Sequence, residues 1–108
     1  ERAFYLVAKV EGEIVGYAGC WVVFDEAHIT NVATLPQYRR KKIATKLLAS
    51  LEERVTKLGV ESLTLEVRVS NQAAQYLYQQ IGFQPAGLRK RYYTDNNEDA
   101  LIMWKRGK

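Results

Sequence analysis

The chain has 108 residues, of which 47% are hydrophobic and 26% charged, and its formal net charge is +4. Such a composition is ordinary for one compact domain with a modest core, and it excludes disordered and fibrous proteins. No apolar run approaches the roughly 20 residues that a bilayer span requires, so no membrane partner is expected. The basic excess favours anionic partners, or it is simply a solvated surface.

Only one cysteine, Cys20, is present, so no internal disulfide can form. Because disulfides mark oxidising compartments, this favours a cytoplasmic location. A strand pattern from Phe4 to Val10 follows almost directly on Glu1, without an initiator methionine. We therefore expect residues 1–108 to form a single domain that is truncated at its N-terminus.

The first third of the chain predicts three strands. A short turn centred on Gly12 separates the first two as a hairpin. Gly16 and Gly19 weaken the second strand and predict a bulge or a close backbone approach. Pro36 ends the third, because proline cannot donate to a ladder. The three strands are expected over Ala3–Val10, Ile14–Val23 and Ala27–Thr34.

A long helix and a fourth strand come next. After residue 42 the apolar period becomes 3.6, and Gly59 stands where a helix C′ glycine belongs. A strand over Glu61–Val69 then alternates, with Leu63, Leu65, Val67 and Val69 on the inner side. The helix should bury one face made of Ile43, Ala44, Leu47, Leu48, Leu51, Val55 and Leu58.

A second helix and two final strands complete the chain. Ser70 or Asn71 is placed to cap the helix, which Gly82 ends. The order β-β-β-α-β-α-β-β predicts an α/β (α+β) domain whose mixed sheet is flanked by helices. The last two strands are expected over Gln84–Tyr92 and Asp99–Lys105.

Four consecutive cations lie at or just before the N-terminus of the long helix: Arg39, Arg40, Lys41 and Lys42. Unpaired N–H groups and the helix dipole make that end positive, so a cation there typically costs about 0.3–1 kcal/mol. A bound phosphate would turn this penalty into binding energy. The alternative is a basic turn whose side chains point into solvent.

Several segments together resemble the GNAT acetyltransferases, and within them the RimI-type ribosomal-protein-alanine N-acetyltransferases. They are N-V-A-T-L-P, L-E-V-R-V-S-N-Q-A-A-Q-Y-L-Y-Q-Q-I-G-F, R-K-R-Y-Y and E-D-A-L-I-M, and the likeness extends from Ala3 to Trp104. The resemblance implies a GNAT-like, mostly antiparallel mixed sheet that lacks the usual N-terminal strand and two helices. It also implies acetyl-CoA as the donor, and as the acceptor the N-terminal amine of a ribosomal protein that starts with alanine.

The same resemblance implies where acetyl-CoA binds: in a V-shaped opening between the third strand and the strand after the long helix. Main-chain groups of Val32, Ala33 and Thr34 would pair with the pantetheine arm, and Asn71 would contact it in addition to capping its helix. The pyrophosphate would lie in the turn and first helical residues, namely Arg39, Arg40, Lys41, Lys42, Ile43, Ala44 and Thr45.

That turn departs from the usual Q/R-x-x-G-x-G/A pattern, because Lys42 occupies the inner glycine position. Glycine there lets the backbone approach phosphate without a Cβ. We therefore expect weakened or altered binding, which the Lys42 ammonium can compensate by meeting a phosphate oxygen.

Two residues are expected to do the chemistry. The resemblance implies Glu66 as general base and Tyr78 as the acid that protonates the departing thiolate. From the alternation alone, Glu66 is better interpreted as a surface glutamate paired with Arg68 or a lysine, and the motif reverses this interpretation. The alternative for Tyr78 is a core aromatic, because it shares the apolar face of its helix. A buried ring with its hydroxyl in the cleft satisfies both readings of Tyr78.

His28 and Cys20 have no partner at ligand spacing, so both are interpreted as structural and no metal is expected.

Three alternatives to the proposed activity remain open. One is a GNAT enzyme that acts on another amine. Another is a fold-retaining but inactive fragment. The third is a basic RNA-binding or ribosome-binding module, because residues 38–42 and 89–93 combine cations with tyrosines. Direct nucleic-acid binding is not expected, since it leaves Glu66 and Tyr78 without a purpose.

Overall fold

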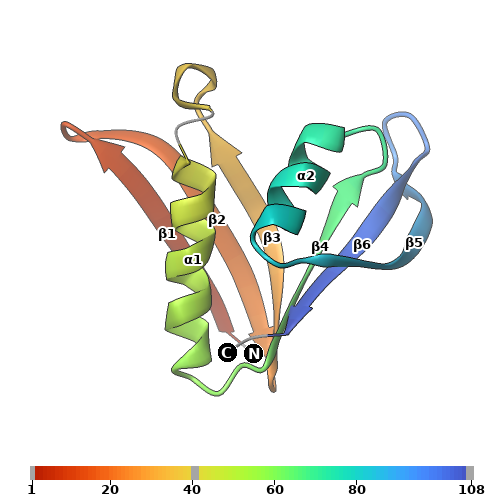
Figure 1. The fold of residues 1–108 in the computed structure, drawn as a ribbon, viewed down its shortest axis with the longest axis horizontal. Coiled ribbons are helices and arrows are strands. Elements are labelled where there is room, and N and C mark those ends of the chain that lie inside the picture. Colours follow the sequence, from red (N-terminus) through yellow and green to blue (C-terminus); the bar gives the residue numbers. More distant parts are fainter. Residues whose placement is uncertain (1, 40–41, 107–108) are drawn as a thin grey trace.

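The computed structural model describes residues 2–39 and 42–106 and contains the expected sequence of elements (Figure 1). The unexpected addition is a 3-10 turn, η1, whose first residue is Pro36. Proline suits that position because its fixed φ starts a helical turn and its missing N–H is not needed there. The strands are β1 Arg2–Val10, β2 Glu13–Val23, β3 Glu26–Thr34, β4 Ser62–Arg68, β5 Gln84–Tyr93 and β6 Glu98–Arg106; the helices are η1 Pro36–Tyr38, α1 Ile43–Thr56 and α2 Gln72–Gln80.

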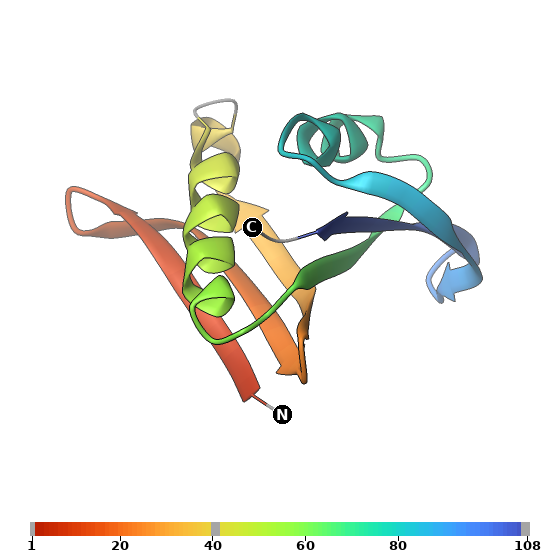
Figure 2. The ribbon, with the colours of Figure 1, turned by 60° about the horizontal axis from the view of Figure 1, so that its bottom comes forward.

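The six strands form one sheet in the order β1-β2-β3-β4-β6-β5. Only β3 and β4 are parallel, and every other neighbouring pair is antiparallel. Both helices lie on the same face of this sheet (Figure 2), where residues of α1 and residues just after α2 line one small hollow. The predicted mixed, mostly antiparallel sheet is confirmed. In the described part of the chain, no helix is both long and apolar enough to cross a membrane.

The core lies between the helices and the sheet. Strand alternation turns Leu63, Leu65 and Val67 of β4 toward it, as predicted, and all three are buried. The largest fully buried side chains come from both halves of the chain: Leu51, Leu63, Met103, Val15, Val55 and Cys20.

Two residues predicted to face this core are exposed instead, so the prediction was wrong for them. Leu58 follows the end of α1 at Thr56 and is 45% exposed, and Val69 follows the end of β4 at Arg68. In both cases the element ends before the last apolar residue of the pattern, so the period no longer controls where the side chain points.

Gly16 and Gly19 allow the close packing that the sequence predicted. A Cβ on Gly16 would lie 2.9 Å from the Ala33 carbonyl oxygen, and one on Gly19 would overlap the ring of Tyr5. The register shifts beside both glycines. Ala8 of β1 pairs with Gly16 and Lys9 with Ile14, so one residue of β2 is left without a partner in β1. Gly19 pairs with Asn31 and the next residue with Ile29, so one residue of β3 is left without a partner in β2. Such a bulge bends and twists its strand.

The bend separates β3 from β4 and creates the expected V-shaped opening. The two strands are paired only from Glu26 to His28 of β3, opposite residues 62–64 of β4. Beyond His28 they diverge toward their carboxyl ends, as Figure 1 shows. Parallel strands that separate leave main-chain N–H and C=O groups without a ladder partner, which a ligand can use.

Candidate active site

A cleft of about 230 Å³ occupies the opening between β3 and β4. Its walls come from both strands, from α2 and its cap, and from the end of β5. Functional side chains that line it include Glu66, Arg68, Asn71, Tyr78 and Tyr93. The fold therefore brings the predicted base and the predicted acid to one cavity.

Glu66 lies on the side of β4 opposite the buried leucines, and its side chain is only 9% exposed. Its Oε1 atom is 2.7 Å from His28 Nε2, and its Oε2 atom is 3.5 Å from Arg89 Nε. Among the described residues, Glu66 does not make the alternative pairing with Arg68 or a lysine, because Arg68 is engaged by Asp95 and Glu98. Since a carboxylate only accepts hydrogen bonds, His28 Nε2 carries a proton and donates it.

Tyr78 combines the two roles considered for it. Its ring packs edge-on against Phe83, with 6.0 Å between the ring centroids, and contacts the core. The residue also lines the cleft. Burial, and to a lesser extent the neighbouring Tyr93, raises the pKa of the Tyr78 phenol. The phenol therefore stays protonated at neutral pH and has a proton to donate.

Asn71 is the cap of α2, with Oδ1 accepting a hydrogen bond of 3.1 Å from the Ala74 N–H. It also lines the cleft, so capping does not remove it from the site. Val32 lines the cleft as well, whereas Ala33 and Thr34 lie further along β3, opposite Tyr17 and Gly16 of β2. Of the three predicted β3 contacts, only Val32 belongs to the cavity wall.

The predicted phosphate-binding turn is described in part, because Arg40 and Lys41 lie outside the described residues. Lys42 precedes α1 in the left-handed conformation, with φ of 62°, and its carbonyl accepts the Lys46 N–H at 3.0 Å. Glycine adopts this conformation without steric cost, which is a backbone reason to expect glycine there. Among the described residues, no side chain caps the N-terminus of α1. The N–H groups of its first turn, from Ile43 through Ala44 and Thr45, are therefore suited to an anion.

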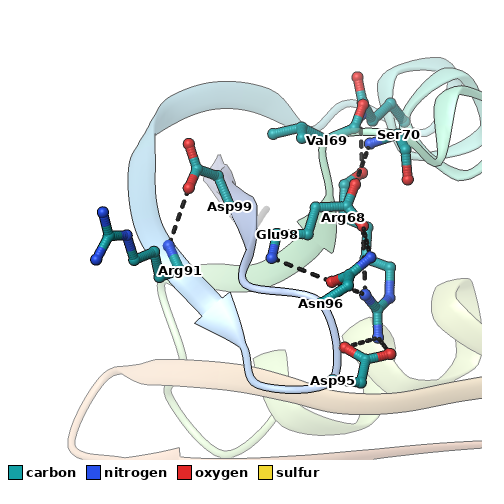
Figure 3. A network of polar contacts seen from close by, with 9 residues as sticks. Arg68, Val69, Ser70, Arg91, Asp95, Asn96, Glu98 and Asp99 are labelled. Carbon is teal, nitrogen blue, oxygen red and sulfur yellow. Dashed lines mark hydrogen bonds and ion pairs between the residues drawn. The ribbon is translucent and has the colours of Figure 1, made fainter.

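Sequence reasoning missed the network around Arg68, shown in Figure 3. Arg68 binds both carboxylate oxygens of Asp95 at 3.1 and 3.0 Å, contacts Glu98 at 3.3 Å and lies 4.0 Å from the centre of the Tyr93 ring. Glu98 in turn accepts the Ser70 N–H at 2.7 Å. These contacts fix the β5–β6 turn to the junction of β4 and α2, at the edge of the cleft.

Glu98 should make the stability of the protein depend on acid pH. Hydrogen bonds from Ser70, aided by Arg68 and Asn96, lower the pKa of Glu98 from 4.5 to about 2. The ionised carboxylate therefore stabilises the fold above pH 4.5, and this contribution is lost as the pH falls toward 2. Between pH 5 and 2, the melting temperature should fall less for Glu98→Gln than for wild type. Glu53→Gln, at an exposed position on α1, is the control; an equal fall for Glu98→Gln and wild type would contradict the assignment.

Comparisons with known proteins show which family the sequence and the fold resemble. The acetyltransferase (GNAT) family profile matches residues 1–83. The chain is 51% identical over 102 residues to a putative ribosomal protein bS18-alanine N-acetyltransferase of Bacillus subtilis, covering 94% of this chain and 68% of that protein. It is 45% identical over 105 residues to the ribosomal protein bS18-alanine N-acetyltransferase of Escherichia coli K12, covering 95% and 71%. The crystal structure of the ribosomal-protein-S18-alanine N-acetyltransferase from Escherichia coli superimposes with a TM-score of 0.91 at 40% identity, over 100% of this chain and 71% of that one.

Proposed function

The chain belongs to the GNAT acetyltransferase family, and from this premise we propose that it acetylates the N-terminal alanine of ribosomal protein bS18. It is an acetyl-CoA-dependent N-acetyltransferase, as its family and its named relatives indicate. The observation that carries the proposal is the cleft between β3 and β4, which has a carboxylate and a phenol in its wall. A ribosomal acceptor and the free Cys20 support a cytoplasmic location.

Acetyl-CoA supplies the acetyl group as a thioester, and the acceptor amine must be neutral to attack it. In our proposal Glu66 takes the proton from the acceptor ammonium. An ordinary carboxylate is a weaker base than an N-terminal amine by about 3.5 pKa units, so its immediate surroundings decide how well it performs. A side chain that is 9% exposed, at the wall of the cleft, supports this role.

Tyr78 is proposed as the proton donor to the departing thiolate. Its position in the cleft wall supports this role, because the phenol is protonated at neutral pH and has a proton available when the thiolate forms. Burial raises the pKa of Tyr78, so the proton transfer depends on direct contact between the phenol and the thiolate. Phe83 and the core hold the ring in one place. A fixed donor loses little entropy in the transition state.

We propose the first turn of α1 and the turn before it as the phosphate site. Support comes from the exposed cations Arg39 and Lys42 and from the uncapped N-terminus of α1. Main-chain groups of Val32, Ala33 and Thr34 in the diverging half of β3 are the proposed contacts to the pantetheine arm, together with Asn71. The proposed turn comprises Arg39, Arg40, Lys41, Lys42, Ile43, Ala44 and Thr45.

A thiol-release assay tests the function. With acetyl-CoA, a peptide that carries the N-terminal sequence of bS18 should be acetylated, whereas the same peptide with a blocked N-terminus should not. Transfer to the blocked peptide at a lysine side chain would instead favour an enzyme for another amine. No transfer to any amine, together with RNA binding that weakens steeply with salt, would favour the basic binding module.

Acetyl-CoA should also raise the melting temperature of the protein, and a dephosphorylated pantetheine analogue should raise it less. The reason is that only the first ligand has a pyrophosphate for the turn before α1, and tighter binding stabilises the fold by mass action. Thermal denaturation at matched ligand concentrations measures the difference. Equal stabilisation by both ligands would remove the phosphate-site proposal.

Lys42→Gly should weaken acetyl-CoA binding several-fold and flatten its dependence on salt. The change removes an ammonium that we expect to meet a phosphate, although it also relieves the positive φ at this position. Lys42→Ala is the matched control, since it removes the same charge and keeps the Cβ. Calorimetric titration at two ionic strengths should show both variants weakened. Tighter binding by Lys42→Gly at both salts would show that the lysine obstructs the site.

A further inference from the structure

His28 makes a short contact with the proposed catalytic base, although the sequence pattern indicated only a structural role for it. Its Nε2 atom lies 2.7 Å from Glu66 Oε1, and the two residues are 38 positions apart in the chain. His28 is the last residue of β3 that is paired with β4, so it lies at the closed end of the V-shaped opening. Its side chain is 38% exposed, which leaves the ring open to exchange of protons with solvent.

The chemistry of the His28–Glu66 pair determines which ring nitrogen of His28 carries the proton. A carboxylate offers no proton, so Nε2 is the protonated nitrogen whether the ring is neutral or charged. The other ring nitrogen, Nδ1, therefore gains the second proton when His28 becomes an imidazolium. The hydrogen bond to Oε1 persists in both states, and only the charge next to Glu66 changes.

The two oxygens of Glu66 have different surroundings. Oε1 is held by the short bond from His28, whereas Oε2 faces Arg89 at 3.5 Å, and the Arg89 side chain is 56% exposed. A long contact to an exposed side chain is easily displaced. Oε2 is therefore the oxygen that an incoming ammonium can reach, and Oε1 is the oxygen through which His28 holds the carboxylate in place.

Several other groups carry charge or can titrate near this pair. Arg89 approaches from β5, and Tyr93 lies close enough to Glu66 for its pKa to be affected by that carboxylate. Arg68 lies two residues along β4 on the same face, with its charge engaged by Asp95 and Glu98. Glu26 lies two residues before His28 on the same face of β3. Histidine is the side-chain type whose charge most often acts as a switch near neutral pH.

We propose that His28 is a positioning residue for Glu66 and sets the acid limit of activity, an inference that rests on the proposed function. Neutral His28 orients the carboxylate through Oε1 and leaves Oε2 to accept the ammonium proton, which then passes to water. A charged His28 places a positive charge beside Glu66 and repels the incoming ammonium. Activity should therefore rise as His28 loses its second proton.

Two substitutions separate orientation from charge. His28→Gln keeps a donor for Oε1 but cannot titrate, and His28→Phe keeps a ring without a donor. At pH 8, His28→Phe should lower kcat about tenfold or more with unchanged acetyl-CoA affinity, because a hydrogen bond to a charged group is lost. His28→Gln should restore at least about a third of wild-type kcat. On acidification from pH 8 to 6, His28→Gln should lose less activity than wild type, because the acceptor amine is the same for both.

A measurement without turnover tests the contact itself. The sequence contains one histidine, so its imidazole signals in NMR spectra need no assignment. Nitrogen chemical shifts should show the neutral ring as the Nε2–H tautomer in wild type and as a mixture of tautomers in Glu66→Ala. A ring that carries its proton on Nδ1 in wild type would overturn the inference.

The outcomes distinguish this inference from the function on which it rests. If Glu66→Gln abolishes acetylation while both His28 variants match wild type in kcat and pH profile, the role of His28 is refuted and the proposed base stands. If Glu66→Gln keeps wild-type turnover, the proposed base is refuted and the inference with it.

Discussion

Glu66→Gln and Tyr78→Phe should each lower turnover by about 10²–10⁴ while acetyl-CoA affinity changes little, if both residues transfer protons as proposed. Each substitution keeps the shape of the side chain and removes the group that accepts or donates the proton. Phenylalanine at position 78 retains the edge-on contact with Phe83, so the helix and the core should remain in place. The expected loss is therefore in kcat rather than in folding.

Steady-state kinetics at saturating peptide from pH 6 to 9, with acetyl-CoA binding measured separately, test this expectation. Tyr76→Phe is the matched control for the tyrosine, because Tyr76 lies on the same helix and is 64% exposed. It should retain wild-type turnover. The catalytic roles fail if Glu66→Gln and Tyr78→Phe keep near-wild-type kcat across the pH range.

Leu51→Ala should destabilise the fold by about 2–5 kcal/mol, which is the range for removing a fully buried leucine side chain. Leu51 has 0% exposure, and it belongs to the cluster that joins α1 to the sheet. Alanine keeps the helix propensity, so the expected loss comes from the cavity and the lost apolar contacts. For a domain whose total stability is typically about 5–15 kcal/mol, this loss is large.

Leu58→Ala is the matched control, because the chemical change is the same and Leu58 is 45% exposed. It should cost less than about 1 kcal/mol. Urea denaturation of both variants measures the difference, and the change in midpoint should be much larger for Leu51→Ala. Equal losses would show that the helix continues to pack beyond Thr56.

Much of the fold followed from local pattern. The alternation in β4 predicted which residues are buried, and the 3.6 period predicted α1, because the core-facing side of each element must be apolar whatever the strand order. Asn71 as a cap and Gly59 after a helix were also readable, since each satisfies a local requirement of a helix end. Gly59 has φ of 96°, and Asn71 accepts the expected N–H. The point where α1 ends was less certain, and Leu58 was therefore misplaced.

The surroundings of the candidate site were decided by tertiary structure alone. Glu66 was found through its motif, but its partners His28 and Arg89 lie on strands β3 and β5. The nearest charged neighbour on its own strand, Arg68, binds Asp95 instead. The Glu66–His28 contact joins residues 38 positions apart, and the Arg68–Asp95 contact joins residues 27 apart. Local propensity and periodicity act over a few residues. Which distant side chains meet depends on strand order, on register and on the bulge that separates β3 from β4, and these are set by the packing of the whole sheet.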